Sequence, residues 1–330
     1  MKLKFDANLK YQEQAISSIK YLFRGQTPMQ SNFTVLAYAG QVGIYDTENG
    51  VGNKLELDET EILKNLNEIQ LNNGILQTKE LKNLKYDFDV EMETGTGKTY
   101  IYLRTIFELH KNYGFCKFII VVPSIAIKEG VYKSLQITAE HFKGLYDNTI
   151  YEYFIYDSEK LEQVRNFAVS DNIQIMVINI DAFRKSFDDP TKENKSNIIH
   201  RANDKLNGMK PIELIRETNP FVIIDEPQSV DNTPKAKEAI KSLNPLCTIR
   251  YSATHIEKHN LVYKLDAVDA YDLGLVKQIE VAGFQSRDFH NNAYLKLISV
   301  DNKKSPITSR IEIDIHNKDK VDRTIVTVKR

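Results

Sequence analysis

The sequence predicts an α/β fold, in which a parallel sheet flanked by helices is followed by a small antiparallel β extension. Two observations lead to this expectation. Up to about residue 285, short strand-like runs alternate with helix-like segments, the pattern of a parallel sheet with helices on both faces. Beyond that point, aliphatic and polar residues alternate instead, which is typical of antiparallel strands with one covered face.

The strand-like runs of the first region are short and end in polar turns. They cover residues 87–91, 118–122, 175–180, 221–224 and 247–251. Between the first two lies a helix-like segment, Lys98–Lys111, with apolar residues at helical spacing. Because ligands of such sheets bind beyond the carboxyl ends of the strands, the residues that follow these runs are the candidate site residues.

Residues 31–85 do not fit this alternation of strands and helices. They contain a helix-like stretch around Glu59–Gln70, and Asn49-Gly50 and Asn72-Asn73-Gly74 predict turns. We interpret the segment as an insertion.

Residues 286–330 have a different texture. Aliphatic residues alternate with polar ones over 311–315 and 324–328, which predicts an antiparallel β-meander. We therefore expect two domains, a lobe over residues 1–285 and a β-rich connector over 286–330.

The most informative stretch of the chain follows the first strand-like run and opens a helix-like one. Its sequence is Met92-Glu93-Thr94-Gly95-Thr96-Gly97-Lys98-Thr99. In such a turn the backbone N–H groups point inward and the helix N-terminus adds a partial positive charge, so Thr94–Thr99 are expected to bind the phosphates of a nucleotide. Lys98 can reach the β- and γ-phosphates, and the Thr99 hydroxyl can bind Mg²⁺.

Met92 departs from the general pattern GxxxxGK[ST], which has its first glycine at this place. The form Glu-Thr-Gly-Thr-Gly-Lys-Thr is similar to that of helicase-type motors. The alternative is a glycine-rich turn with a surface lysine, and the strand before the turn and the helix after it favour the phosphate site.

A second motif follows the buried strand-like run 221–224. It consists of Asp225-Glu226-Pro227-Gln228. Carboxylates at the end of a buried strand lose solvation, and a bound Mg²⁺·ATP would compensate for this. We expect Asp225 to hold Mg²⁺ and Glu226 to orient and deprotonate the attacking water, while Lys98 is the third catalytic residue. The alternative is a strand followed by a polar turn.

A third motif, Ser252-Ala253-Thr254, follows the run 247–251 and precedes His255. Small hydroxyl residues at a strand end can connect an acidic pair to a neighbouring site through hydrogen bonds. We interpret Gln228 with Ser252, Ala253 and Thr254 as coupling residues between nucleotide and nucleic acid, and His255 as structural or coupling.

In this order the three motifs resemble helicase superfamily two, and more narrowly the restriction (Res) subunit of type III restriction-modification enzymes. Residues 5–16, 23–26, 261–271 and 274–279 resemble further stretches of that family. The resemblance runs from about Phe5 to Val281 and is weak between Gln30 and Lys85.

The resemblance implies a RecA-like P-loop NTPase lobe that uses ATP and Mg²⁺. In the whole enzyme, DNA-dependent ATP hydrolysis would drive translocation or switching on double-stranded DNA before cleavage, with a methyltransferase (Mod) subunit as partner. Gln12 is expected to read adenine through its amide, which offers both a donor and an acceptor. Pro123, Ser124 and Lys128 would meet DNA phosphates, or else form a plain strand-to-helix turn.

The same resemblance implies that parts of the whole enzyme are missing from this chain. No second P-loop-like lobe and no nuclease motif is recognisable after Val281. We therefore expect the N-terminal portion of a longer subunit, which alone hydrolyses ATP barely above background. The alternatives are another superfamily-two helicase or repair translocase, against which residues 261–279 argue, and a non-catalytic nucleotide-binding module.

Composition narrows the expectation further. The formal net charge is −1, so DNA contact requires a local basic surface rather than bulk charge. The two cysteines, Cys116 and Cys247, adjoin apolar runs and are interpreted as buried thiols in a reducing compartment. No signal sequence and no run of membrane-spanning length is recognisable, which predicts a cytoplasmic protein without membrane contact.

Overall fold

We analysed a computed structural model of the chain. It describes residues 4–36, 47–81, 86–184, 195–255, 258–277, 294–301, 306–317 and 320–329. The chain divides into two compact units, with the boundary between Lys277 and Gln278. The boundary expected at 285/286 lies outside the described residues.

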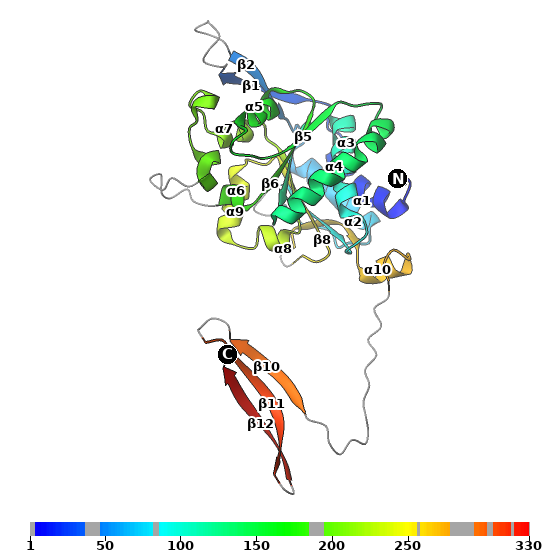
Figure 1. The fold of residues 1–330 in the computed structure, drawn as a ribbon. Helices are drawn as coiled ribbons and strands as arrows, with labels where there is room; N and C mark the ends of the chain where they lie inside the picture. Colours follow the sequence, from blue (N-terminus) through cyan, green and yellow to red (C-terminus); the bar gives the residue numbers. More distant parts are fainter. Residues whose placement is uncertain are drawn as a thin grey trace. The chain divides into compact units, whose positions relative to one another are not determined.

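A seven-stranded parallel sheet forms the centre of the first unit, within the described residues (Figure 1). The strand order across the sheet is β5-β6-β4-β7-β8-β3-β9. The strands are β3 (Asp87–Met92), β4 (Lys117–Val122), β5 (Tyr151–Ile155), β6 (Ile173–Asn179), β7 (Phe221–Asp225), β8 (Cys247–Ser252) and β9 (Asn260–Leu265). This confirms the predicted fold class, and each of the five predicted strands is found with its ends within two residues.

Two layers of helices bury the sheet. Along β4, Phe118 and Ile120 face a core formed with one helix layer, while Ile119 and Val121 face a core formed with the other. This alternation on two covered faces explains why the central strands are almost wholly apolar. The first layer contains α1 (Lys10–Lys20), α2 (Glu59–Asn72), α3 (Lys98–Tyr113) and α4 (Ile125–Leu145), and the second contains α5 (Leu161–Val169), α7 (Pro211–Glu217) and α9 (Pro234–Ser242).

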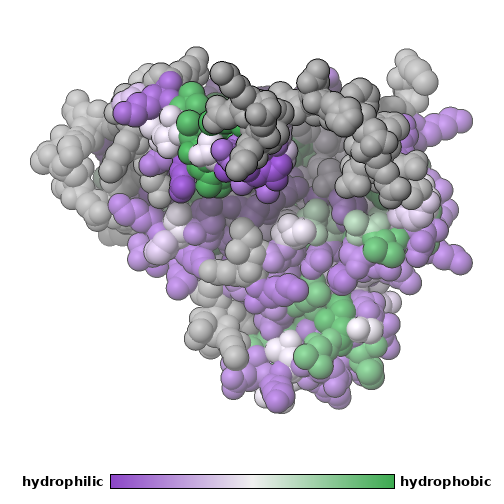
Figure 2. Space-filling view, turned by 90° about the horizontal axis from the view of Figure 1, so that it is seen from below, coloured by the Kyte–Doolittle hydropathy of each residue, from purple (hydrophilic) through white to green (hydrophobic). Residues whose placement is uncertain are grey.

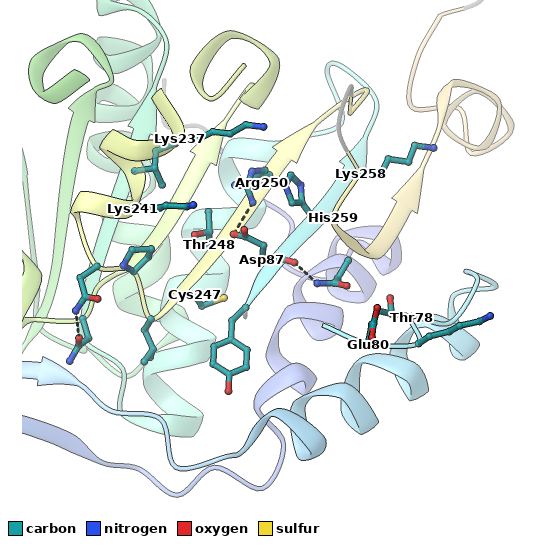
Figure 3. Close-up of a pocket in the computed structure, with 18 of the residues that line it drawn as sticks. Thr78, Glu80, Asp87, Lys237, Lys241, Cys247, Thr248, Arg250, Lys258 and His259 are labelled. Carbon is teal, nitrogen blue, oxygen red and sulfur yellow. Dashed lines mark hydrogen bonds and ion pairs between the residues drawn. The ribbon is translucent and has the colours of Figure 1, made fainter. Parts of the chain in front are cut away.

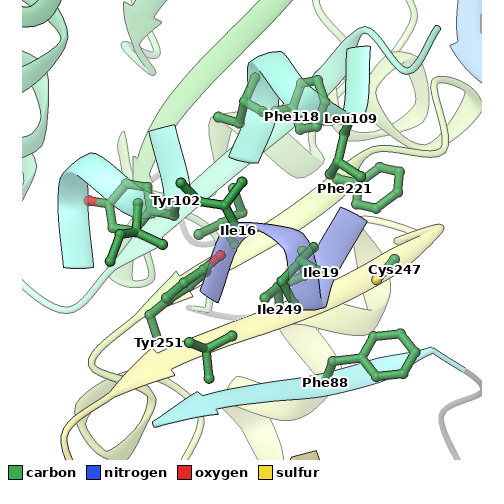
Figure 4. Close-up of a cluster of buried hydrophobic side chains, with 14 of the residues drawn as sticks. Ile16, Ile19, Phe88, Tyr102, Leu109, Phe118, Phe221, Cys247, Ile249 and Tyr251 are labelled. Carbon is green, nitrogen blue, oxygen red and sulfur yellow. The ribbon is translucent and has the colours of Figure 1, made fainter. Parts of the chain in front are cut away.

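Side chains of α1 and α3 pack directly on the sheet. Figure 4 shows Ile16 and Ile19 of α1 and Tyr102 of α3 over strand β8, which carries Ile249 and Tyr251. Helix α3 ends where Gly114 adopts φ +74°, a conformation that favours glycine. The shorter elements are the 3₁₀ turns η1 (Tyr21–Phe23), η2 (Lys195–His200) and η3 (Asp204–Leu206) and the helices α6 (Asp181–Arg184), α8 (Pro227–Val230) and α10 (Ala267–Asp272).

The segment interpreted as an insertion contains more structure than the predicted helix. Strands β1 (Gln30–Leu36) and β2 (Thr47–Asn53) pair antiparallel before α2. The turn expected at Asn49-Gly50 is wrong, since both residues lie inside β2. Gly50 sits there because the ring of Phe33 on β1 fills the space of a side chain: an added Cβ would lie 2.3 Å from that ring.

The second unit contains a three-stranded antiparallel sheet of β10 (Leu295–Asp301), β11 (Thr308–Asn317) and β12 (Lys320–Lys329). The predicted meander is therefore confirmed. Leu297, Ile311 and Val326 lie in register on one face.

The described helices include none that is both long and apolar enough to cross a lipid bilayer. Hydrophilic side chains cover much of the visible surface in Figure 2, with hydrophobic ones gathered in separate areas. Both cysteines are buried, as predicted.

Candidate nucleotide-binding site

The three sequence motifs end three strands that are adjacent in the sheet. Strands β7, β8 and β3 are neighbours, and the parallel register aligns their carboxyl ends. The Gly-Lys-Thr turn, the Asp-Glu pair and the Ser-Ala-Thr segment therefore lie side by side along the edge of the sheet formed by the carboxyl ends of its strands. We call this edge, with Gln12 beside it, the nucleotide edge.

The turn after β3 requires glycine at two positions. Gly95 and Gly97 adopt φ +84° and +90°, in the left-handed region where a side chain is strained. Between them Thr96 is buried, and its hydroxyl donates to the Glu93 carbonyl oxygen at 2.6 Å. Thr94 and Gly95 are exposed, and an added Cβ at Gly95 would meet no atom within 4 Å. The turn is thus held from within and open on its outer side.

Lys98 begins α3 and reaches back into the turn. Its Nζ donates to the Met92 carbonyl oxygen at 3.3 Å and lies 3.3 Å from Glu226 Oε1. Met92 stands where the usual pattern has its first glycine; its side chain is fully buried in the core, and its carbonyl oxygen faces Lys98. The structure therefore places the predicted lysine and the predicted base in direct contact.

Asp225 is the last residue of β7 and is buried. It accepts a hydrogen bond from the hydroxyl of Tyr102 at 3.3 Å. Burial and then the neighbouring charge of Glu226 raise the pKa of Asp225 to about 6, although Lys98 opposes this. The ionised carboxylate is thus under-compensated. Sequence reasoning missed Tyr102, and its position one helical turn after Lys98 was the available signal.

Glu226 adopts an unusual backbone conformation. Its φ is +55°, although it is not glycine, and its N–H donates to the Tyr251 carbonyl oxygen at 3.1 Å. Such conformations cost free energy and persist where the surroundings impose them, often at functional sites. Here the turn directs the Glu226 carboxylate toward Lys98.

A chain of polar contacts runs from Glu226 to the third motif. Gln228 Nε2 donates to Glu226 Oε2 at 2.6 Å, and Ser252 Oγ lies 2.9 Å from Gln228 Oε1. Ser252 Oγ also lies 2.7 Å from the carbonyl oxygen of Thr254 and accepts from its N–H at 3.2 Å. Ala253 lies between these two residues and is half-buried. The structure thus brings the predicted coupling residues into one network.

Gln12 lies beside the turn. It is buried in α1, and its Nε2 is 3.0 Å from the position of a Cβ on Gly97. Nε2 donates to the Tyr11 hydroxyl at 3.1 Å, and this hydroxyl donates to the Thr96 carbonyl oxygen at 3.1 Å. Gln12 Oε1 has no partner within the described residues. Sequence reasoning did not include Tyr11, although it adjoins Gln12.

The residues expected to contact DNA form a separate group after β4. Ser124 caps α4, because its Oγ accepts from the Ile127 N–H at 3.3 Å. Pro123 and Lys128 are half-buried on either side. This capping role is the strand-to-helix turn of the alternative interpretation, and it leaves the DNA contact of Lys128 as a prediction.

The arrangement fits a nucleotide with Mg²⁺. The outer side of the turn is open, Gln12 has an unused acceptor, and Asp225 lacks compensation for its charge. Thr99 is half-buried on the first turn of α3. Within the described residues there is no cluster of three or more His, Cys, Asp or Glu able to hold a metal. Mg²⁺ in nucleotide sites commonly needs only one or two carboxylates together with phosphates and water.

The sheet, the turn and the acidic pair define a RecA-like P-loop lobe. The family model described as type III restriction enzyme, res subunit, matches residues 8–257. The chain therefore belongs to the type III restriction enzyme Res subunit family.

Two relatives show how much of such a subunit this chain covers. It is 32% identical over 298 residues to the EcoP15I Res subunit of Escherichia coli and 31% identical over 288 residues to the EcoPI Res subunit of Escherichia phage P1. Each alignment covers 83% of this chain and 28% of the relative. A Sulfolobus solfataricus SWI2/SNF2 ATPase core in complex with dsDNA aligns over 58% of this chain and 31% of its own, with a TM-score of 0.34 and 13% identity.

Proposed function

We propose that this chain is the ATP-binding first motor lobe of a type III restriction enzyme. In the whole enzyme, DNA-dependent ATP hydrolysis would drive translocation or conformational switching on double-stranded DNA before cleavage. The observation that carries the proposal is the convergence of Lys98, which follows β3, with Asp225 and Glu226, which lie at the end of β7, beside an open glycine turn.

Each residue has a distinct role in this proposal. The N–H groups of the turn and Lys98 hold the phosphates. Thr99 and Asp225 would hold Mg²⁺, which neutralises charge on the phosphate oxygens when bound. Glu226 exchanges its contact with Lys98 for the attacking water and accepts a proton from it. Gln12 presents its free Oε1 to the amino group of adenine, while Tyr11 holds the other end of the amide.

The proposal extends to partners of the whole enzyme. The network from Glu226 through Gln228 to Ser252 and Thr254 would report nucleotide state to bound DNA. Double-stranded DNA would contact Pro123, Ser124 and Lys128, and a methyltransferase (Mod) subunit would supply the recognition sequence.

Glu226→Gln tests the proposal in the full-length enzyme assembled with its Mod subunit. The substitution keeps the hydrogen bond to Gln228 and removes the base. We expect nucleotide affinity to survive while DNA-stimulated ATP turnover falls by about two orders of magnitude or more.

The matched control is Glu238→Gln, an exposed glutamate on α9. It should leave both quantities unchanged. Turnover of Glu226→Gln near that of the control would show that Glu226 is not the base.

A further inference from the structure

Strand β3 has two faces of opposite character. Phe88, Val90 and Met92 lie in the hydrophobic core, whereas the residues between them are acidic. The neighbouring strand β8 shows the same division, with Ile249 and Tyr251 in the core. The resulting polar face consists of Asp87, Asp89 and Glu91 of β3 with Thr248, Arg250 and Ser252 of β8 (Figure 3 shows Asp87, Thr248 and Arg250).

The chain crosses this polar face between β8 and β9. Both strands pair with β3 and run parallel to it, on opposite sides. Strand β8 ends at Ser252 and β9 begins at Asn260, although a parallel crossover usually takes roughly a dozen residues or more and contains a helix. The described residues of this link, 253–255 and 258–259, form no helix that could be buried against the sheet, so polar side chains must hold them.

Asp89 provides that hold. It is fully buried, and its Oδ2 accepts from the backbone N–H of His259 at 2.7 Å. His259 Nδ1 lies 3.3 Å from Asp89 Oδ1, and His255 Nε2 lies 3.8 Å from the same oxygen. Burial raises the pKa of Asp89, but the hydrogen bonds of His259 and the charge of His255 outweigh it, so the pKa is lowered overall.

His255 lies between Asp89 and the second motif. Its side chain is 2% exposed, and neither ring nitrogen has a hydrogen-bond partner within the described residues. The imidazole borders a cavity of about 70 Å³ together with Gln228, Asp231 and Arg250. A polar cavity of this size can hold water, which would satisfy the imidazole and join it to Gln228.

We propose that Asp89 is a positioning residue that holds His255 and His259, and through them the adjoining Ser252 and Thr254, on the strand that carries the phosphate turn. This rests on the proposed function, because Ser252 matters as the end of the network from Glu226. One end of the third motif is then tied to Gln228 and the other to β3. When Glu226 changes its contacts, the third motif would therefore shift relative to β3 and stay ordered.

Asp89→Asn in the 330-residue chain tests this, with Glu91→Gln as the matched control. Glu91 is on the same face and strand, carries the same charge and is half-exposed. The measurements are titration with Mg²⁺ and a non-hydrolysable ATP analogue, and hydrogen exchange of residues 252–260 with and without that analogue.

In the wild type and in Glu91→Gln, we expect the analogue to slow exchange in this segment. In Asp89→Asn, the affinity for the analogue should stay within about twofold of the wild type. Exchange without nucleotide should be roughly tenfold faster, because a charge-assisted bond is replaced by a neutral one, and the response to the analogue should disappear. His259→Ala keeps the backbone N–H and serves if Asp89→Asn fails to fold; it should accelerate exchange in the same direction but less.

Two results would overturn the proposal. One is unchanged exchange of the segment in Asp89→Asn or His259→Ala, and the other is a loss of analogue affinity as large as that of Lys98→Ala. Failure of the wild type to bind the analogue would instead contradict the proposed function. The exchange difference between Asp89→Asn and Glu91→Gln without nucleotide would still decide whether Asp89 holds the segment.

Discussion

The nucleotide edge and the polar face contain the same kinds of charged side chain but compensate them differently. At the nucleotide edge, buried Asp225 has a tyrosine hydroxyl as its hydrogen-bond donor and a raised pKa. On the polar face, Arg250 donates to Asp231 at 2.7 Å and to Asp87 at 2.9 Å. In the first region the buried carboxylate has a neutral hydroxyl as its donor, whereas in the second one arginine pairs with two buried carboxylates.

This difference separates a site for a ligand from a part of the framework. A buried charge without a partner is costly, so its persistence indicates that something charged completes the site. A buried charge that is paired with opposite charges connects the elements that carry them. Removing one partner leaves an unpaired buried charge, which destabilises the fold.

The incompleteness of the nucleotide edge predicts the largest effect. Among the described residues, Lys98 is the cation that contacts Glu226. Arginine fingers in related phosphoryl-transfer enzymes contribute about 10³–10⁵ in rate. We expect purified residues 1–330 to bind Mg²⁺·ATP weakly and to hydrolyse it barely above background, with or without DNA. Steady-state phosphate release, compared with that of the full-length enzyme, measures this. Robust DNA-stimulated turnover that needs no added partner would show that the nucleotide edge of this chain is complete for catalysis.

Arg250→Met removes the cation that pairs with Asp87 and Asp231. Asp87 and Asp231 then remain buried without a cation, which should lower the free energy of unfolding by about 3–5 kcal/mol. Denaturant unfolding followed by circular dichroism gives the value. Arg24→Met is the control, because the Arg24–Glu68 pair is about half-exposed and should matter little. Equal stabilities of the two variants would show that the pairing of Arg250 with Asp87 and Asp231 does not stabilise the fold.

Lys98→Ala removes the cation of the nucleotide edge. We expect a loss of about 1.5–3 kcal/mol in nucleotide affinity, since a charge-assisted contact to the phosphates disappears. Titration with a fluorescent ATP analogue measures the affinity. The control is Lys235→Ala, an exposed lysine at the start of α9. If Lys98→Ala bound as well as this control, the turn would not be a phosphate site.

The raised pKa of Asp225 makes the nucleotide edge sensitive to pH. The ordinary value is 3.8 and the value in the fold is about 6, so the folded state favours the protonated form. The contribution of Asp225 to the stability of the ligand-free chain should therefore fall as the pH rises from 3.8 through about 6, while Mg²⁺ affinity rises up to tenfold per pH unit over the same range. Asp225→Asn should abolish both trends in thermal unfolding and calorimetric titration. An unchanged stability profile in that variant would assign the trend to another group.

Gln12→Ala is expected to have the smallest effect. It leaves the phosphate turn intact and removes a neutral amide, worth about 1 kcal/mol of ATP affinity. Preference for ATP over GTP should shrink, mainly through weaker ATP binding. Competition of the two nucleotides for the same fluorescent analogue measures this. A variant with undiminished preference would show that other groups read the base.

Local patterns in the sequence were sufficient for the elements of the nucleotide edge. The strand-like run, the glycines and Lys98 lie together in the chain, and Asp225 and Glu226 directly follow an apolar run, so short-range backbone chemistry predicts them. The alternating pattern of residues 311–328 was equally local. The turn expected at Asn49-Gly50 failed for a tertiary reason, because Gly50 accommodates the ring of Phe33 on a neighbouring strand.

Only the tertiary structure decided which charges are paired. The acidic residues of β3 alternate with apolar ones, a pattern typical of a strand with one face in water. Asp87 and Asp89 are nevertheless buried, because Arg250 and His259 return to them from far along the chain. The strand order β7-β8-β3 likewise depends on how the crossovers pack. A sequence pattern specifies which face a residue occupies, whereas the partner it meets there is set by the path of the rest of the chain.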